Sequence, residues 1–237
     1  MFGFMIIRIL FLILIGVPVT VFAQSKWVPS AVRVGVDLYD IVLTTVKSNR
    51  TIYEFNADVD FHKYFFSFDY GIFEGSESNV IYDYSSKGYF WRLGLDINLT
   101  PYEKSRSVVF FGLRYAEAAF DDKVQFDFNS YYFGNGRVIR ENKDLYATWY
   151  EMVMGLKVPI WKFVQLGLTG RMKFGRNMKT SNSLESLLVP GYGRGISRTE
   201  FAINYHLFFR IPFRNKPIPP KPERKKAAVE AATQSVN

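Results

Sequence analysis

The chain of 237 residues contains no cysteine. This absence excludes disulfide bonds, thiolate metal sites and attachment of a lipid to an N-terminal cysteine. Beyond residue 23 the sequence also lacks any run of the ~18 consecutive apolar residues that a transmembrane helix requires. Concentrated positive charge is missing from the body of the chain, because half of the net charge of +8 lies in residues 214–237. We therefore do not expect a nucleic-acid-binding protein.

The N-terminus has the features of a secretory signal peptide. One cation, Arg8, precedes an apolar run from Ile9 to Val17, and Val21-Phe22-Ala23 forms a small-residue cleavage site. A retained membrane anchor is the alternative. The Val-x-Ala ending and the lack of a basic flank favour cleavage after Ala23. We expect residues 1–23 to be removed and the mature chain to be exported.

Apolar and polar residues alternate along eight segments of the mature chain, a period typical of β-strands with one apolar face. Residues 53–61, for example, interleave five apolar side chains with four polar ones. Most segments are about 9–13 residues long, which suits tilted strands that cross a bilayer. The segments are 32–38, 52–61, 64–73, 88–99, 108–118, 146–158, 163–174 and 197–211.

The connections between these segments alternate between short and long. Three are short (62–63, 100–107 and 159–162), and four are long and polar (39–51, 74–87, 119–145 and 175–196). Short turns at one end and long loops at the other are typical of an outer-membrane barrel, and termini at the short-turn end require an even number of strands. The sequence predicts an all-β fold, a transmembrane antiparallel eight-stranded up-and-down barrel over residues 24–213 with short periplasmic turns and long extracellular loops.

A soluble barrel with an apolar interior would alternate in the same way. Three features favour the membrane: aromatic residues crowd the strand ends, glycines lie on the polar face, and the charges of that face balance. A closed interior needs such balance, because a buried charge must find a partner. The charged residues assigned to the lumen are Arg33, Arg92, Arg114, Lys157, Arg171, Lys173, Arg198 and Arg210 against Asp37, Glu54, Asp58, Asp60, Asp69, Asp96, Glu151 and Glu200.

Three stretches resemble a known family. They are VRVGVDLYDIV from residue 32, GLDINLTPYEKSRSVVFFGLRYAEAAFDD from residue 94, and YHLFFRIPF from residue 205 before a Pro/Lys tail. Together they resemble an uncharacterised Bacteroidota family of outer-membrane β-barrel proteins, the domain of unknown function numbered 6048. The resemblance implies a location and a fold, and it supplies no catalytic residues. Small barrels of this kind include accessory subunits of Bacteroidota outer-membrane machines.

Few residues are candidates for chemistry. His206 lies on a predicted strand, low in the lumen, and no Ser is expected near it, so we interpret it as a member of the lumenal charge network and not as a catalytic base. Glu54, Asp58 and Asp60 could form a metal or acid/base cluster, but ion pairs with facing Arg residues are the preferred interpretation. The glycine-rich stretches 134–136 and 191–195 lack the context of phosphate loops. We expect no catalytic residue, metal or cofactor.

Two segments outside the barrel are candidates for protein contacts. Residues 119–145 predict a hairpin above the membrane with a turn at Asn135-Gly136, and its aromatics either contact a partner or pack on neighbouring loops. The Pro-rich tail, 214–237, is by default disordered and could contact headgroups, peptidoglycan or a partner. The candidate partner-binding residues are Phe126, Phe128, Tyr131, Tyr132, Phe133, Arg224, Lys225 and Lys226.

An eight-stranded barrel is just wide enough for side chains to fill, so a general porin is not expected. The sequence favours a non-enzymatic accessory subunit or adaptor of a larger outer-membrane protein complex. Two alternatives stay open: a barrel enzyme that modifies lipid or lipopolysaccharide, and a stand-alone surface barrel for adhesion or membrane stability.

Overall fold

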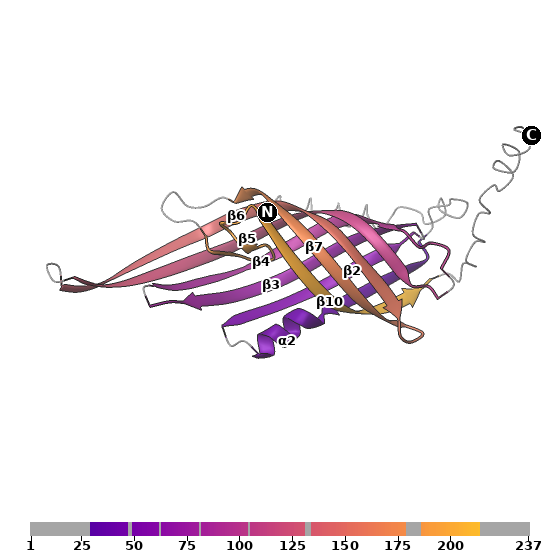
Figure 1. The fold of residues 1–237 in the computed structure, drawn as a ribbon, viewed down its shortest axis with the longest axis horizontal. Coiled ribbons are helices and arrows are strands. Elements are labelled where there is room, and N and C mark those ends of the chain that lie inside the picture. The colour runs from indigo at the N-terminus through magenta and orange to yellow at the C-terminus, as the bar shows by residue number, and fades with distance from the viewer. Residues whose placement is uncertain are drawn as a thin grey trace, which may run out of the picture.

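The structure, a computed structural model, describes residues 29–46, 49–61, 63–80, 82–103, 105–130, 134–178 and 186–213. Within these ranges eight strands close into an antiparallel barrel in the order β1-β10-β7-β6-β5-β4-β3-β2 (Figure 1). Their bounds are Ala31–Asp37 for β1, Arg50–Asp60 for β2, Tyr64–Ser78 for β3, Tyr82–Asn98 for β4, Val108–Ser130 for β5, Gly134–Pro159 for β6, Val164–Met178 for β7 and Thr199–Pro212 for β10. The predicted signal peptide and tail lie outside the described residues.

Every strand of the barrel pairs with its neighbours in the sequence, and β1 closes the circle. It pairs with β10 from Ala31↔Pro212 to Asp37↔His206, and with β2 from Ala31↔Asp60 to Val36↔Phe55. This arrangement confirms the predicted eight-stranded up-and-down barrel. Among the described residues, no helix is both long and apolar enough to cross a membrane.

The side chains alternate between the two faces of the wall as the sequence pattern predicts. On β3, residues 65, 67, 69, 71 and 73 are buried in the lumen, whereas Phe66, Phe68, Tyr70 and Ile72 are exposed on the outside. The lumen is the core of the molecule, because it holds the buried side chains, among them the aromatic rings of Phe65, Phe90 and Trp149.

The predictions of long loops at 74–87 and 119–145 are wrong, because most of each segment belongs to a strand. Strands β3 and β4 remain paired up to Ser78↔Asp83, and β5 and β6 up to Ser130↔Gly134. The predicted turn at Asn135-Gly136 is also wrong, since both residues pair with β5 and the connection falls at 131–133, outside the described residues. These extensions carry polar residues on their outer face, so the apolar alternation ends while the backbone ladder continues.

The predicted loop 39–51 contains the helix α2, Leu38–Val46. Asp37 caps its N-terminus, because Oδ1 accepts hydrogen bonds from the backbone N–H groups of Tyr39 (2.8 Å) and Asp40 (3.4 Å). Thr44 holds the helix against β2, since its hydroxyl donates to the Ile52 carbonyl (3.1 Å) and accepts from the Ile52 N–H (2.9 Å). The helix therefore takes the place that a longer β1 would occupy beside the upper half of β2.

The segment after β7 folds back into the barrel. Strands β8, Leu188–Val189, and β9, Gly193–Arg194, form a small hairpin around Gly191. Tyr192 is buried and its ring lies 5.6 Å from that of Trp149 on β6. Gly191 has a φ of 71°, and a Cβ there would lie 2.4 Å from the Phe90 ring, so only glycine fits. We call residues 186–195 the lumen hairpin.

Replacing Thr44 by Val removes both hydrogen bonds to Ile52 and keeps the branched shape of the side chain. We expect the free energy of unfolding to fall by about 1–3 kcal/mol, because the backbone N–H and C=O groups of Ile52 lose their partner. Thr44→Ser keeps the hydroxyl and should keep most of the stability. Urea unfolding in phospholipid vesicles, followed by tryptophan fluorescence, measures the difference. Equal stability of Thr44→Val and the wild type would show that α2 is not held to β2 by this contact.

Candidate functional site

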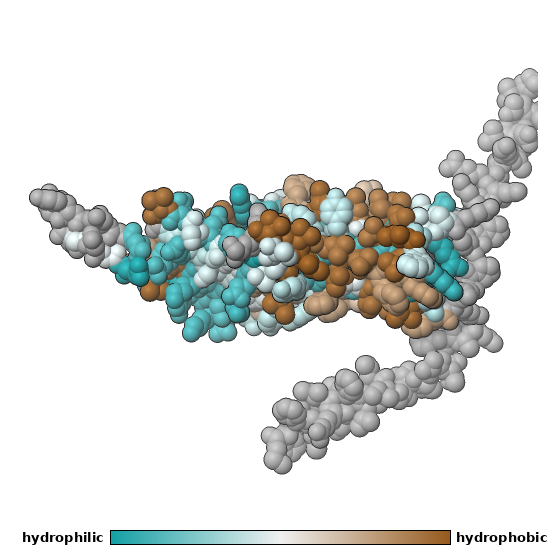
Figure 2. All heavy atoms as spheres, turned by 90° about the horizontal axis from the view of Figure 1, so that it is seen from below, coloured by the Kyte–Doolittle hydropathy of each residue, from teal (hydrophilic) through white to brown (hydrophobic). Residues whose placement is uncertain are grey.

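The outer surface of the barrel carries a continuous apolar belt. Figure 2 shows the hydrophobic residues gathered over the half of the barrel nearer the short turns, with hydrophilic residues toward the long hairpins. Every strand contributes exposed apolar side chains to it, among them Val34, Phe55, Phe68, Leu95, Leu113, Met154, Leu166 and Phe209. An exposed belt of this extent matches the lipid-facing band of a membrane barrel.

Aromatic side chains border the belt. Toward the long hairpins a row crosses four strands, with ring centroids 6.3 Å apart for Tyr70–Tyr89, 5.8 Å for Trp91–Tyr115 and 5.6 Å for Tyr115–Tyr150. Near the short turns Phe163 and Phe209 lie 6.1 Å apart, and Trp161 is 78% exposed. Two aromatic borders around an apolar belt are the outer surface of a transmembrane barrel.

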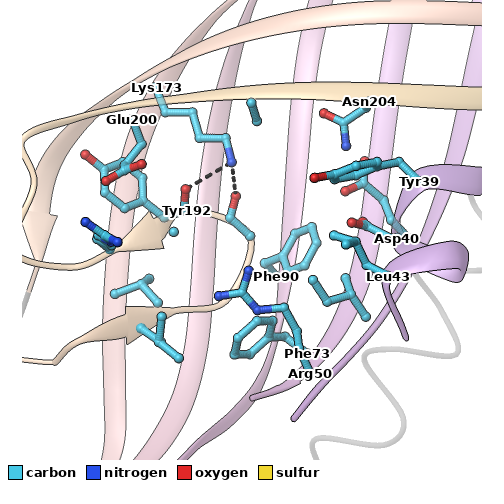
Figure 3. Close-up of a pocket in the computed structure, with 18 of the residues that line it drawn as sticks. Tyr39, Asp40, Leu43, Arg50, Phe73, Phe90, Lys173, Tyr192, Glu200 and Asn204 are labelled. Carbon is cyan, nitrogen blue, oxygen red and sulfur yellow. Dashed lines mark hydrogen bonds between the residues drawn. The ribbon is translucent and has the colours of Figure 1, made fainter. Parts of the chain in front are cut away.

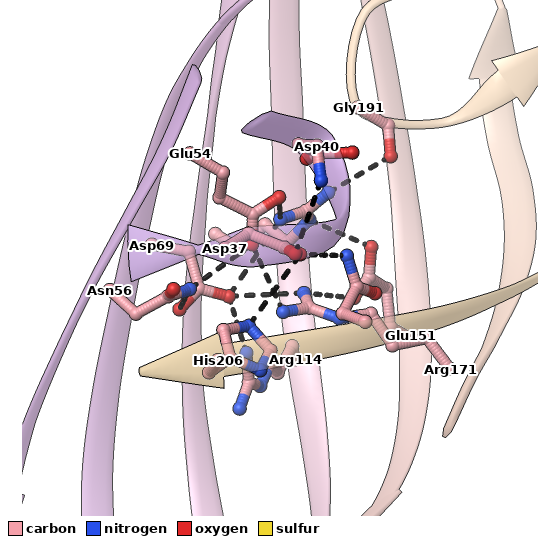
Figure 4. Close-up of polar contacts among 12 residues, drawn as sticks. Asp37, Asp40, Glu54, Asn56, Asp69, Arg114, Glu151, Arg171, Gly191 and His206 are labelled. Atoms are coloured by element: carbon pink, nitrogen blue, oxygen red, sulfur yellow. Dashed lines mark hydrogen bonds and ion pairs between the residues drawn. The ribbon is translucent and has the colours of Figure 1, made fainter. Parts of the chain in front are cut away.

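Inside the barrel, buried arginines and carboxylates form a cluster that spans the lumen (Figure 4). Arg171 contacts three carboxylates, with Nη2 3.1 Å from Glu54 and Nη1 3.1 Å from Asp69 and 3.3 Å from Glu151. Arg92 adds contacts of 2.8 Å to Glu54 and 3.0 Å to Glu151. All five side chains are at most 3% exposed. Each of these charges therefore has oppositely charged partners in the protein within 3.3 Å.

The strand register explains why these groups meet. Asp69 on β3 lies opposite Arg92 on β4, and Arg114 on β5 lies opposite Glu151 on β6. Arg114 in turn binds Asp69 and approaches Asp96 Oδ2 to 3.2 Å. Opposite charges on neighbouring strands thus face one another at successive lumenal positions.

A second ion-pair group lies nearer the short turns. Asp58 accepts contacts of 2.6 Å from both Arg33 Nε and Lys157 Nζ. The Lys157 ammonium lies 4.8 Å from the ring centroid of Phe110 and 4.9 Å from that of Phe208, so aromatic faces surround the cation. The two groups fill the lumen from its centre to its lower end.

The close packing requires small residues at specific positions. A Cβ on Gly112 would lie 1.9 Å from Asp96 Oδ1, and a Cβ on Gly71 would lie 2.1 Å from the Phe90 ring. Both glycines face the lumen, where they make room for a larger side chain on the neighbouring strand. The space left beside the ion pairs is a cavity of about 10 Å³, enough for one water.

His206 lies at the centre of the lumen and not low in it, which corrects the expectation from the sequence. Its Nε2 is 3.9 Å from Asp37 Oδ2, its ring stacks on Phe208 at 5.3 Å, and neither ring nitrogen has a hydrogen-bond partner. The expectation of no nearby Ser is also wrong, because Ser67 lines the same 10 Å³ cavity. The Ser67 hydroxyl makes no hydrogen bond there, and a space of this size admits no substrate.

One group of side chains has the composition of a cation site. Ligand atoms of Asp37, Glu54 and His206 lie within 4.8 Å of one another, and all three residues are buried. The surrounding charges oppose a metal ion, since Arg92 and Arg171 already contact the two Glu54 oxygens. Glu54 and Asp58 are thus members of ion pairs.

The lumen hairpin covers the ion-pair cluster from above. Lys173 Nζ donates to the backbone oxygens of Gly191 (2.8 Å) and Tyr192 (3.0 Å) (Figure 3). Arg92 Nη2 donates to the backbone oxygen of Gly191 (3.0 Å). Two cations of the wall therefore hold the turn of the hairpin by its carbonyl groups.

Asp122 fastens the other side of the lumen hairpin. A shift of register after Phe120 precedes Asp122, whose carboxylate accepts hydrogen bonds from Tyr84 (3.0 Å), Ser186 (2.7 Å) and Asn142 (2.7 Å). Nothing in the sequence pattern singles out this residue. From the alternation alone, the face on which Asp122 lies cannot be assigned, because the bulge after Phe120 changes the register of the strand.

Several predicted site residues lie outside the buried cluster. Arg198 precedes β10 and is exposed, so it does not belong to the network. Glu200 is half-buried at a cavity near the upper end of β10, and Arg210 is half-buried opposite Arg33 at the lower end. Phe126 packs against Tyr82, whereas the side chain of Phe128 and the predicted partner residues 131–133 and 224–226 lie outside the described part of the chain.

Comparisons with known proteins give a family and two similar solved structures. A family model described as Domain of unknown function (DUF6048) matches residues 18–216, and no curated protein matches the chain. The N-terminal β-barrel domain of Pseudomonas aeruginosa OprF is 10% identical with a TM-score of 0.40, over 77% of this chain and 98% of that one. Acinetobacter baumannii CarO is 14% identical with a TM-score of 0.41, over 80% of this chain and 100% of that one.

Replacing Arg92 by Met leaves the buried carboxylates of Glu54 and Glu151 with one arginine fewer. We expect the free energy of unfolding to fall by about 3–5 kcal/mol, because breaking a buried ion pair leaves an uncompensated charge. Lys87→Met on the same strand is the matched control. Lys87 lies 3.1 Å from Glu74, and both side chains are more than 60% exposed, so its loss should cost less than about 1 kcal/mol. Equal losses in urea unfolding would refute the role assigned to burial.

Proposed function

The chain belongs to the family described as Domain of unknown function (DUF6048), a description that names no activity. We propose that it is a non-enzymatic barrel of the outer membrane that serves as accessory subunit or adaptor of a larger protein complex. The mature chain would follow removal of residues 1–23, with the short turns and both termini in the periplasm and the long hairpins outside. Origin in the Bacteroidota stays a prediction from the resemblance.

The observation that carries this proposal is the projecting hairpin of β5 and β6. Pairing with β4 ends at Tyr82↔Phe126, yet β5 and β6 continue together to Ser130↔Gly134 (Figure 1). We call residues 127–137 the arm. Beyond Phe126 no described strand borders β5, so the arm presents two strand edges and both faces to its surroundings. A paired ribbon of this kind is stiffer than a loop and offers a preformed contact surface.

An ion pair stiffens the arm. Arg137 binds Asp127 through two parallel hydrogen bonds of 2.7 and 3.2 Å, and the guanidinium holds the pKa of that carboxyl below its usual range. At the base of the arm Val138 and Ile139 are exposed, which supplies apolar contact area beside the charges. Phe126, by contrast, is half-buried against Tyr82, so it supports the arm and does not present itself to a partner.

The filled lumen supports a role in contacts instead of transport or catalysis. Buried ion pairs cross the barrel at two levels, and the cavity between these levels measures about 10 Å³. An enzyme of the membrane surface needs an activated group near a rim, where substrate can reach it. His206 is instead enclosed among arginines, carboxylates and Phe208.

The wild-type protein should conduct almost no ions. A closed lumen held by charge pairs offers no continuous water path, so planar bilayers containing the purified chain should show conductance at the level of the protein-free bilayer. A general porin added to the same bilayer serves as the positive control. A steady current through the wild-type protein alone would mean that the lumen is a pore.

Replacing the arm, residues 127–137, by an Asn-Gly turn should release a partner protein while the barrel still assembles. The cut ends, Phe126 and Val138, lie opposite each other, so a two-residue turn can join them. Partner retention is measured by gentle extraction of the tagged chain from native membranes, and assembly by the gel shift on heating. His206→Ala is the comparison, because it alters the lumen and leaves the arm intact. Loss of cellular function in folded His206→Ala, with the arm variant unaffected, would favour an enzyme.

A further inference from the structure

The barrel wall is incomplete between β10 and β2. Pairing of β1 with β10 stops at Asp37↔His206, so residues 199–205 of β10 have β7 on one edge and no strand on the other. The matching free edge of β2 lies beside α2, where Thr44 binds Ile52. Among the described residues, no hydrogen bond joins α2 to residues 199–205. The edge of β2 is therefore hydrogen-bonded to α2, whereas α2 lies near β10 without a hydrogen bond to the edge of residues 199–205. We call this edge of β10 the open edge.

A cavity of about 860 Å³ runs along the open edge (Figure 3). The cavity is the upper part of the lumen, bordered from within by the lumen hairpin and by the charged side chains of Glu54, Arg92 and Lys173. Six consecutive residues of β10, 200–205, line it on one side, and α2 lines it with Tyr39, Asp40 and Leu43. Side chains of a strand alternate between its two faces, so six in a row can border one space only if it follows the strand edge. The backbone donors and acceptors of β10 thus face this cavity.

The cavity opens through the wall at the apolar outer surface. Phe201, Ile203 and Tyr205 line it from β10, and their exposed fractions are 72%, 60% and 52%. On the facing helix Val42 and Val46 are exposed as well. The lips of the gap are therefore apolar and continue the lipid-facing belt, whereas Ala202 and Asn204 face inward.

The chemistry of an open edge selects its occupant. Hydrocarbon chains cannot bond backbone N–H and C=O groups, and lipid-exposed sheet edges do not occur in membranes for that reason. An extended peptide segment satisfies such an edge completely by strand addition. The geometry points to residues 199–205 of β10 as the docking site for an extended segment of a partner protein, which pairs with β10 in the gap beside α2. This inference rests on the proposed adaptor role and names where the partner is held.

The open edge is long enough for a short strand. Residues 199–205 of β10 rise about 3.4 Å each, so the edge spans roughly 20 Å and can pair with an extended segment of similar length. The partner segment should alternate apolar side chains beside Ile203 with small or polar ones beside Ala202 and Asn204.

Hydrogen exchange tests the pairing directly. The full chain is measured alone in phosphatidylethanolamine nanodiscs and again in outer-membrane vesicles of the producing cell. We expect the amides of residues 200–205 to exchange at least ten-fold more slowly in the vesicles. The amides of residues 207–211 should be equally slow in both, because β1 and β7 already pair with that part of β10. If the amides of residues 200–205 are already protected in the nanodiscs, where no partner protein is present, the inference is overturned, since lipid, α2 or a second copy of the chain would then cover the edge.

Variants separate this contact from the adaptor role itself. Ala202→Trp places a bulky ring beside the open edge and should abolish the ten-fold protection in vesicles, whereas Leu207→Trp, outside the cavity on the same strand, should keep it. If Ala202→Trp shows no gel shift on heating, that variant has not assembled a barrel, and a second pair of variants is used. Ile203→Asn should then abolish the protection, whereas Ile211→Asn, on the same outward face but outside the cavity, should keep it. A complex that co-purifies from the vesicles without protection at 200–205 would sink the edge contact and leave the adaptor role standing. A chain that is unprotected and purifies alone would refute both.

Discussion

Arg171 touches three carboxylates from three strands, Glu54 on β2, Asp69 on β3 and Glu151 on β6, at the centre of the lumen, and the cavity beside these ion pairs has room for one water. Charges in such a place must be paired, because desolvation of a lone ion costs several kcal/mol. The pairing depends on register, since a slip of one residue would turn each charge into the lipid and each apolar group into the lumen. The ion-pair cluster therefore fixes the register of the strands. The same register places the apolar residues on the outer face, where they form the belt.

The cluster also compensates for the incomplete wall. Above Asp37↔His206 no strand joins β10 to β2. Arg171 of β7, however, lies opposite Ala202 of β10 and reaches over the lumen to Glu54 of β2. Side chains thus connect the two sides of the gap where backbone bonds do not. Asp37 ends β1 at this level, because its carboxylate caps α2 and also binds Asn204 of β10. A single residue both stops the strand and ties it to the neighbouring wall.

The sequence predicts the barrel well because period 2 is visible wherever one face meets lipid and the other meets charges. It fails where that contrast ends. Above the belt the outer face of β3–β6 is polar and the apolar residues, such as Phe73, Tyr84 and Val124, lie on the inner face, so the pattern of the belt is lost and the strands there look like loops. Asn135-Gly136 likewise reads as a turn, although a three-residue connection precedes it. Helix α2 is missed because Asp37, its cap, also fits the lumenal pattern of β1. The lumen hairpin depends on contacts between distant residues, such as Ser186 with Asp122, which no local pattern records.

A filled lumen and an unfinished wall are consistent with each other. A conducting barrel needs a continuous ladder, because nothing else holds its circumference around water. Here the ion pairs of Glu54, Arg92 and Arg171 hold the centre, and the lumen hairpin is fastened above them by Lys173 and Asp122. With the interior fixed in this way, the wall can leave seven residues of β10 unpaired on one side without loss of closure below. Packing in the lumen frees the wall for contacts, which is the physical reason to look for function on the outside of this barrel.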